Sequence, residues 1–115
     1  MPATCRGLSM AKGADERIQV EIDQDLEPVV PEYLEKRFRD CTEIGRLLAS
    51  GGMDRIQVMG HHMKGSGGSF GFDEISEIGE ALEIAARAVD AEGVRSAVGR
   101  LERYLARVTV AYINV

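Results

Sequence analysis

The chain has 115 residues, of which 44% are hydrophobic and 29% are charged, and its formal net charge is -5 at pH 7. This length suits a single domain with one hydrophobic core, and the composition is typical of a folded soluble protein rather than a disordered chain. The acidic balance argues against nucleic acid as a partner, because nucleic-acid-binding domains normally carry a basic patch or stripe.

Two features bear on where the protein works. The N-terminal residues have no apolar core of signal-peptide length, and no later run approaches the roughly 20 apolar residues of a membrane span. The two cysteines, Cys5 and Cys41, have no C-x-x-C spacing and predict no disulfide framework, which favours a reducing compartment. We therefore expect a cytoplasmic protein without membrane insertion, in which Cys41 is a small core residue.

The N-terminal part of the chain predicts a tail followed by a short extended segment. Residues 1–17 are rich in small and polar side chains without periodicity, so we expect a flexible tail. Residues 18–23 alternate between apolar and polar, and their possible partner strand is 108–112, although that segment also continues a helical pattern. Asp25 can then cap a short helical turn, and Pro31 suits the first turn of the next helix.

Four long amphipathic helices are predicted beyond this point. The first ends at the stop signal Gly51-Gly52, and the second spans about 54–69 and is closed by Phe70-Gly71. Asp73 and Asp90 stand as the N-caps of the third and fourth helices. The predicted apolar stripes are Leu34, Phe38, Cys41 and Leu48 beside Tyr33 and Ile44 in the first helix, Ile75, Ile78, Leu82, Ala85 and Val89 in the third, and Val94, Val98, Leu101, Leu105 and Val108 beside Ala97 and Tyr104 in the fourth.

The connections between these helices are short, which favours antiparallel neighbours. We therefore predict an all-α fold, an up-and-down antiparallel four-helix bundle with a short extra N-terminal helical turn, over residues 18–115. A solenoid of paired helices would show self-similarity at a fixed period, and none is visible in the sequence.

The second predicted helix has two opposed faces. At about 100° per residue its apolar residues form one stripe, which consists of Ile56, Met59, Met63 and Phe70. The opposite face carries His61, Lys64, Gly65 and Gly68. His61 should therefore project into solvent with a free imidazole nitrogen, and Lys64, one turn on, can offset negative charge attached to the ring.

The two glycines on this face need an explanation, because each costs about 1 kcal/mol relative to alanine in a helix interior. Without a Cβ at Gly65 and Gly68, the surface of a partner could approach the helix backbone closely. An imidazole, a cation and a cleared surface together suit transfer of an anionic group, above all a phosphoryl group.

The residues of this helix and of the next one also have simpler interpretations. A solitary histidine on a helix is usually a surface residue without a role, and only the surrounding pattern argues otherwise for His61. His62 borders the apolar stripe, so we expect it to pack there or to bond to a neighbouring helix. Glu74, Glu77 and Glu80 are expected to form a solvated helix face.

Three alternative functions follow from the same residues. Adjacent histidines suggest a metal, but they point about 100° apart on a helix and no Cys or carboxylate at ligand spacing completes a set, so we expect no metal site. The run from Lys64 to Gly68 lacks the G-x-x-x-x-G-K-[ST] order and follows no strand, which gives nucleotide binding little support. A helical adaptor that binds a signalling partner through the glycine-cleared face, without chemistry, stays open on the sequence alone.

The run from Gly60 to Gly71 resembles the signature of histidine-containing phosphotransfer (HPt) domains, which is His-x-x-Lys-Gly followed by small residues and a further Gly after an apolar position. The places of that pattern are filled in register by His61, Lys64, Gly65, Ser66, Phe70 and Gly71. The likeness extends from about residue 25 to about residue 110 and includes the stretch 78–83. The spacing to Lys64 selects His61 rather than His62, in agreement with the two helix faces.

The resemblance implies a phosphorelay intermediate rather than an enzyme with a kinase domain of its own, for which the chain has no room. His61 would accept a phosphoryl group from a receiver-domain aspartyl phosphate or a kinase and pass it on, and Lys64 would offset charge on the phosphorylated ring. Gly65 and Gly68 would let the receiver seat over the site. The partners would be receiver domains of response regulators or hybrid histidine kinases, and Mg²⁺ in the acidic pocket of the receiver would leave this chain with no cofactor of its own.

Overall fold

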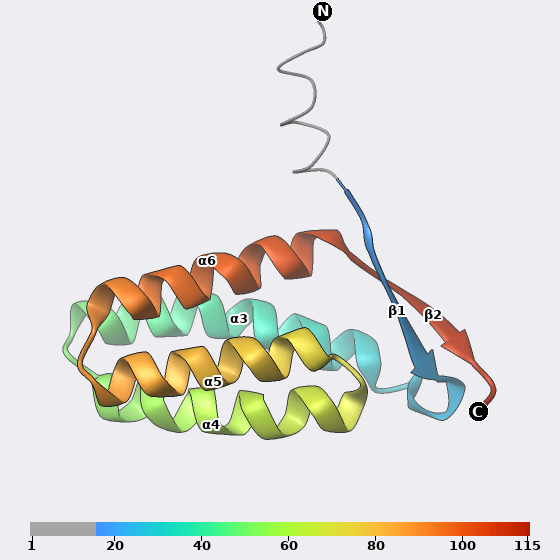
Figure 1. Cartoon of the computed structure of the whole chain (residues 1–115), viewed down its shortest axis with the longest axis horizontal. Coiled ribbons are helices and arrows are strands. Elements are labelled where there is room, and N and C mark those ends of the chain that lie inside the picture. The colour runs from blue at the N-terminus through green and yellow to red at the C-terminus, as the bar shows by residue number, and fades with distance from the viewer. Residues whose placement is uncertain (1–15) are drawn as a thin grey trace, which may run out of the picture.

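The computed structural model of the chain describes residues 16–115, so the predicted tail lies outside the described residues except for Glu16 and Arg17, as does Cys5 (Figure 1). The elements in chain order are β1 (Ile18–Asp23), η1 (Gln24–Leu26), α3 (Val30–Ala49), α4 (Met53–Phe70), α5 (Asp73–Arg87), α6 (Ala91–Arg107) and β2 (Val108–Ile113). None of the helices within this described part has both the length and the apolar character that crossing a bilayer requires.

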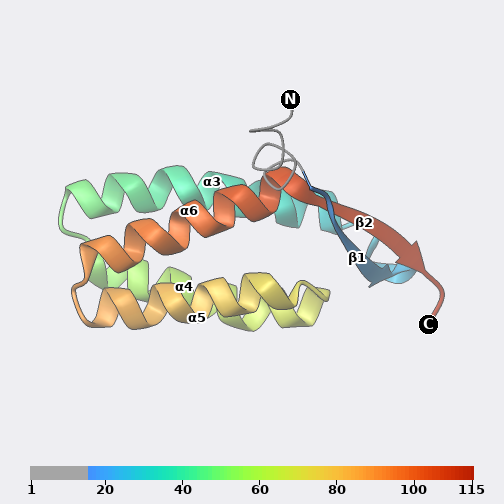
Figure 2. The same cartoon turned by 45° about the horizontal axis from the view of Figure 1, so that its top comes forward.

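The four long helices run alternately in opposite directions and form the predicted up-and-down bundle (Figures 1 and 2). The short extra N-terminal turn is also present as the 3₁₀ turn η1, but its cap is Asp23 rather than the predicted Asp25. The N–H of Asp25 donates to Oδ1 of Asp23 at 2.9 Å, because an N-cap side chain satisfies a backbone donor two residues on.

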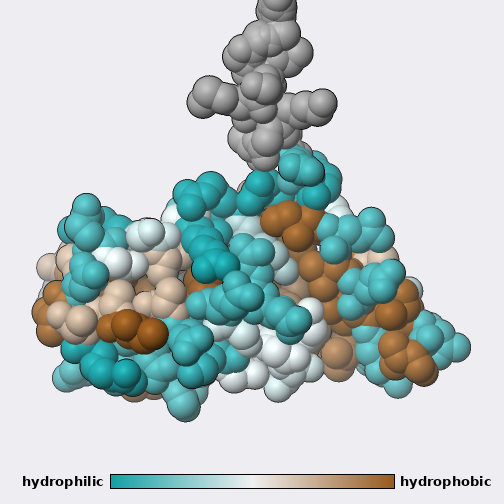
Figure 3. All heavy atoms as spheres, viewed as in Figure 1, coloured by the Kyte–Doolittle hydropathy of each residue, from teal (hydrophilic) through white to brown (hydrophobic). Residues whose placement is uncertain are grey.

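The predicted extended segment pairs with the C-terminal segment as a two-stranded parallel sheet. Ile18 lies opposite Val108, and the register continues to Asp23 opposite Ile113, so the whole helical bundle connects the two strands. Apolar side chains from both strands pack on the core, namely Ile18, Val20, Ile22, Val108, Val110 and Tyr112. Val108 therefore begins a strand instead of closing the stripe of the last helix. Apolar surface gathers over this strand end of the molecule in Figure 3.

The buried face of α3 is rotated from the predicted one. Val30, Tyr33, Cys41, Ile44 and Leu47 are buried, whereas the predicted Phe38 is 54% exposed. The neighbouring Arg37 takes the inward position, because its guanidinium lies 4.7 Å above the Tyr33 ring and its Nε is 2.8 Å from Oδ2 of Asp40. The apolar pattern alone therefore predicts the wrong buried face for α3, because it does not include the partly buried Arg37.

Cys41 is a core residue, as the sequence predicts. Burial, with smaller effects of Glu102 and Asp40, raises the pKa of its thiol to about 11. The thiol therefore stays protonated near neutral pH and is a poor nucleophile.

The ends of the helices follow the predicted signals with two exceptions. Gly71 ends α4 in the left-handed conformation at φ 92°, and Asp90 caps α6 by accepting from the N–H of Gly93 at 3.0 Å. The N-cap of α5, however, is Phe72 rather than Asp73, and no side chain caps it. Val89 lies beyond the end of α5 at φ 53° and is 70% exposed, so it does not extend the buried stripe.

Candidate functional site

The helix α4 carries the candidate site at its middle. Its apolar side places Ile56 and Met63 in the core, and the imidazole of His61 points away from them with 69% of the side chain exposed. Lys64 is about half exposed one turn later, and Gly65 is exposed. The structure thus brings the predicted imidazole, ammonium and bare backbone together on one open face.

A seam of glycines holds α4 against α5 directly beside this face. A Cβ built on Gly60 would lie 2.7 Å from the backbone nitrogen of Glu83, and one on Gly67 would lie 2.5 Å from that of Ser76. A Cβ on Gly79 would collide with the backbone nitrogen of Lys64 and lie 2.8 Å from the carbonyl oxygen of Gly60. The two helix backbones are therefore in contact, which only glycine permits. The sequence reasoning assigned no role to these three glycines.

The two glycines that were predicted to clear the surface differ from each other. Nothing lies within 4 Å of a Cβ built on Gly65, so the space above it is open. A Cβ on Gly68 would lie 3.3 Å from Oγ of Ser76, whose hydroxyl accepts from the N–H of Gly68 at 2.8 Å and donates to the carbonyl of Lys64. Gly68 is exposed but also belongs to the contact with α5.

Two carboxylates of α5 reach the functional side chains across this seam. Oε2 of Glu83 lies 3.3 Å from Nδ1 of His61, and Oε2 of Glu80 lies 3.6 Å from Nζ of Lys64. Glu80 is thus an ion-pair partner within the site, although the sequence predicted only a solvated face. The sequence prediction did not include Glu83. The signal that could have found it is its spacing of three residues from Glu80, which puts both carboxylates on one helix face.

A hollow of about 370 Å³ opens beside the imidazole. Its lining consists of Asp54, Gln57, Val58, His61 and Glu83. Val58 is a half-exposed apolar residue one turn before His61, so the approach to the ring combines an apolar contact with the two acidic groups at its edge.

His62 departs from its predicted environment. His62 is exposed. It borders a hollow of about 120 Å³ on the side of α3, which Arg37, Asp40 and Met59 also line. Burial raises the pKa of Asp40 and Arg37 partly offsets this effect. The two imidazole centroids are 6.2 Å apart, but each ring lines a different hollow.

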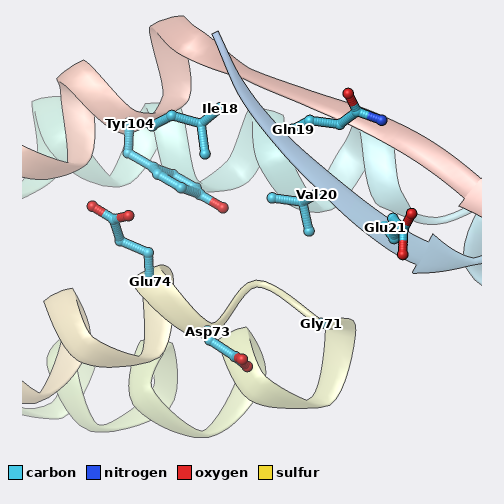
Figure 4. Close-up of a pocket in the computed structure, with 8 residues that line it drawn as sticks. All are labelled: Ile18, Gln19, Val20, Glu21, Gly71, Asp73, Glu74 and Tyr104. Atoms are coloured by element: carbon cyan, nitrogen blue, oxygen red, sulfur yellow. The ribbon is translucent and has the colours of Figure 1, made fainter.

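A larger hollow, of about 500 Å³, lies at the strand end of the bundle (Figure 4). Its lining includes the carboxylates of Glu21, Asp73 and Glu74, together with Tyr104, whose pKa burial and the charges of Glu74 and Asp73 raise to about 12. Three carboxylates repel an anionic group, so this hollow does not suit a phosphoryl group. His61 does not line it.

Among residues 16–115, no three His, Cys, Asp or Glu side chains are grouped so that they could hold a metal ion. Glu83 and Glu80 of α5 each have a cationic partner instead. Oε2 of Glu83 also accepts from Nη2 of Arg87 at 3.2 Å, and Glu80 pairs with Lys64.

Comparison with known proteins bears directly on this arrangement. The family model described as Hpt domain matches residues 29–111, which is most of the chain and includes all four helices of the bundle. Searches of curated proteins and of solved structures gave no match. Hpt domains carry out histidine phosphotransfer in phosphorelays and interact with receiver domains. The extent of the match shows that the chain belongs to the Hpt domain family.

Proposed function

We propose that this chain is a phosphorelay intermediate in which His61 is the residue that carries the phosphoryl group. His61 accepts this group from the aspartyl phosphate of a receiver domain, or from a kinase, and passes it to another receiver. The observation that carries the proposal is the exposed imidazole at the middle of α4, with the ammonium of Lys64 one turn on and open space above Gly65.

The chain contributes a nucleophile and a docking surface. Transfer of a phosphoryl group depends on positioning and on stabilisation of negative charge, and a divalent cation in an acidic pocket serves that need. In our proposal this cation is Mg²⁺ on the receiver, so the chain brings no cofactor of its own. The receivers belong to response regulators or hybrid histidine kinases, and the protein works in the cytoplasm.

The proposal is tested by incubating the chain with a panel of receiver domains that carry a labelled phosphoryl group. We expect label to move to the chain from at least one phosphorylated receiver. The chain should then pass the label on to a second, unphosphorylated receiver. If receivers bind the chain without transfer, and the chain also remains unmodified by the small phosphodonor phosphoramidate, the protein is a helical adaptor instead.

Lys64→Ala is expected to leave the fold intact and to slow phosphoryl transfer by a factor of about 1.4 to 5, because an exposed ion pair contributes about 0.2–1 kcal/mol. The ammonium is held beside Glu80 before transfer and is close enough to His61 to meet the transferred group. Rates measured by rapid quench, with Lys36→Ala on α3 as the control, check this expectation. An unchanged rate and an unchanged lifetime of the phosphorylated form would refute the role of Lys64.

Gly65→Leu is expected to weaken receiver binding without loss of stability, because its side chain would stand in the open space over which the receiver docks. Gly45→Leu on α3 is a matched control, since nothing lies within 4 Å of a Cβ there either. A calorimetric titration with a receiver that transfers to the parent protein compares the two variants. Equal affinity for both would count against docking at Gly65.

A further inference from the structure

The hollow at the strand end of the bundle contains a buried polar group that the fold itself does not satisfy. Tyr104 is only 2% exposed, and its hydroxyl points into the hollow between β1 and the start of α5 (Figure 4). Within residues 16–115 this hydroxyl has no hydrogen-bond partner. Nearly all buried polar groups in folded proteins are hydrogen-bonded, so a hydroxyl of this kind needs a partner from outside the fold.

The charged groups around this hydroxyl define the chemistry of such a partner. Asp73 and Glu74 lie in the first turn of α5, and Glu21 lies on β1. The negative charges of Glu74 and Asp73 act on Tyr104, because they add to the effect of burial and raise the pKa of its hydroxyl. The hydroxyl therefore keeps its proton near neutral pH, and its oxygen can accept a hydrogen bond from a cation.

Arg100 contacts one of these carboxylates without neutralising the group. Its Nε lies 3.4 Å from Oε2 of Glu74, whereas its Nη2 lies nearer, at 2.9 Å, to Oε1 of Glu77 outside the hollow. In the part of the chain that the structure describes, Asp73 and Glu21 have no ion pair at 4.0 Å or less. The hollow therefore keeps an excess of negative charge, which attracts a cation.

The size and the lining of the hollow favour an organic cation over a metal ion. The described residues contain no group of three acidic, histidine or cysteine side chains that could hold a metal. The volume of about 500 Å³ lies in the range of small-molecule sites. Ile18 and Val20 of β1 form an apolar wall beside the ring of Tyr104 (Figure 4), against which an alkyl stem can pack.

We infer that this hollow binds a small organic cation whose N–H groups stand on an apolar stem, namely an alkylammonium or an alkylguanidinium. The N–H donors of the cation pair with the hydroxyl oxygen of Tyr104 and with the carboxylates of Asp73 and Glu74. Its stem lies along the apolar wall on β1. His61 does not line the hollow, so the inference does not depend on the proposed phosphoryl transfer.

Titration calorimetry of the full chain with n-butylamine, n-butylguanidine and tetramethylammonium tests the inference. All three carry one positive charge near neutral pH, but tetramethylammonium has no N–H donor. We expect at least one of the first two to bind about tenfold more tightly than tetramethylammonium, as hydrogen bonds to a charged group require, and the tighter of the two identifies the head group. If neither binds more tightly than tetramethylammonium, the inference is wrong.

Tyr104→Phe removes the hydroxyl and keeps the ring, and Tyr112→Phe on β2 is its control because Tyr112 does not line the hollow. We expect Tyr104→Phe to weaken binding about tenfold without lowering the Tm of the free chain, because no hydrogen bond within the fold is lost. Tyr33→Phe should lower the Tm, since it loses the hydrogen bond to Ser66 at 2.8 Å. A Tyr104→Phe chain that binds as tightly as Tyr112→Phe, or whose Tm falls as far as that of Tyr33→Phe, overturns the inference.

The carboxylate is tested by Asp73→Asn, with Asp25→Asn as a control that removes the same charge from an exposed position outside the hollow. We expect Asp73→Asn to weaken binding about threefold, within the range for an exposed ion pair, and Asp25→Asn to leave it unchanged. Equal losses in the two variants would mean that the net charge of the chain attracts the cation, and the site in the hollow would be refuted.

Discussion

His61→Gln is expected to reduce phosphoryl transfer to the chain to the background of a reaction without it, while His62→Gln retains transfer. Glutamine has no nucleophilic nitrogen, and His61 is the histidine that meets both the open face and the ammonium of Lys64. The measurement follows over time the transfer of a labelled phosphoryl group from a phosphorylated receiver to each variant.

The two variants control for each other, because both replace an exposed histidine of α4 by the same residue. Circular dichroism should show the same helix content for both and for the parent. Label that reaches His61→Gln at the parental rate would show that another residue is the acceptor, and loss of transfer in His62→Gln alone would assign that role to His62.

Gly79→Ala is expected to destabilise the fold by about 1–3 kcal/mol, the range for forcing an extra group into a packed contact. The added Cβ would collide with the backbone of α4 at Lys64 and Gly60, and neither backbone atom can move aside as a flexible side chain could. In a domain of this size about 1 kcal/mol corresponds to roughly 4–8 °C in Tm. Thermal and urea unfolding measure the change.

Gly65→Ala is the matched control for this prediction, since it makes the same substitution in open space on the adjoining helix. It is expected to raise stability by about 0.5–1 kcal/mol, because alanine loses less backbone entropy than glycine when a helix forms. A Gly79→Ala protein as stable as Gly65→Ala would mean that the seam between α4 and α5 can open at little cost. The position of Glu80 and Glu83 beside the site would then need another explanation.

Much of the fold could be predicted from periodicity and helix-end signals. The up-and-down bundle, the extra N-terminal turn, the left-handed end of α4 at Gly71 and the Asp90 cap all follow from local patterns that the structure confirms. The pairing of 18–23 with 108–112 was only one of two possibilities, because a segment that fits both a strand and a helix is decided by what packs against it.

The departures from the prediction have a common cause in tertiary contacts. Phe38 is exposed because Arg37 lies inward by stacking on Tyr33, which an apolar count does not register. Asp73 has the residue type of an N-cap, but α5 begins one residue earlier in the turn that Gly71 sets. Such shifts of one position depend on packing that the local sequence does not encode.

The candidate site shows the same division. His61, Lys64 and Gly65 lie on one helix, so their shared face could be worked out from the angle between successive residues. Glu83 reaches the imidazole from another helix, and its approach depends on contacts of Gly60 and Gly79 that no spacing within one helix reveals. The sequence predicted that glycines let a partner approach the open face. In the structure Gly60, Gly67 and Gly79 instead let α4 and α5 approach each other.

The most direct test of the proposed function is the identity of the phosphorylated residue in the parent protein. A phosphorylated receiver is mixed with the chain, whose histidines carry a nitrogen label. The product is examined by nitrogen and phosphorus NMR before the phosphoryl group is hydrolysed. The account predicts one phosphohistidine, at His61. A phosphoryl group on His62, or on no residue of the chain, would contradict it.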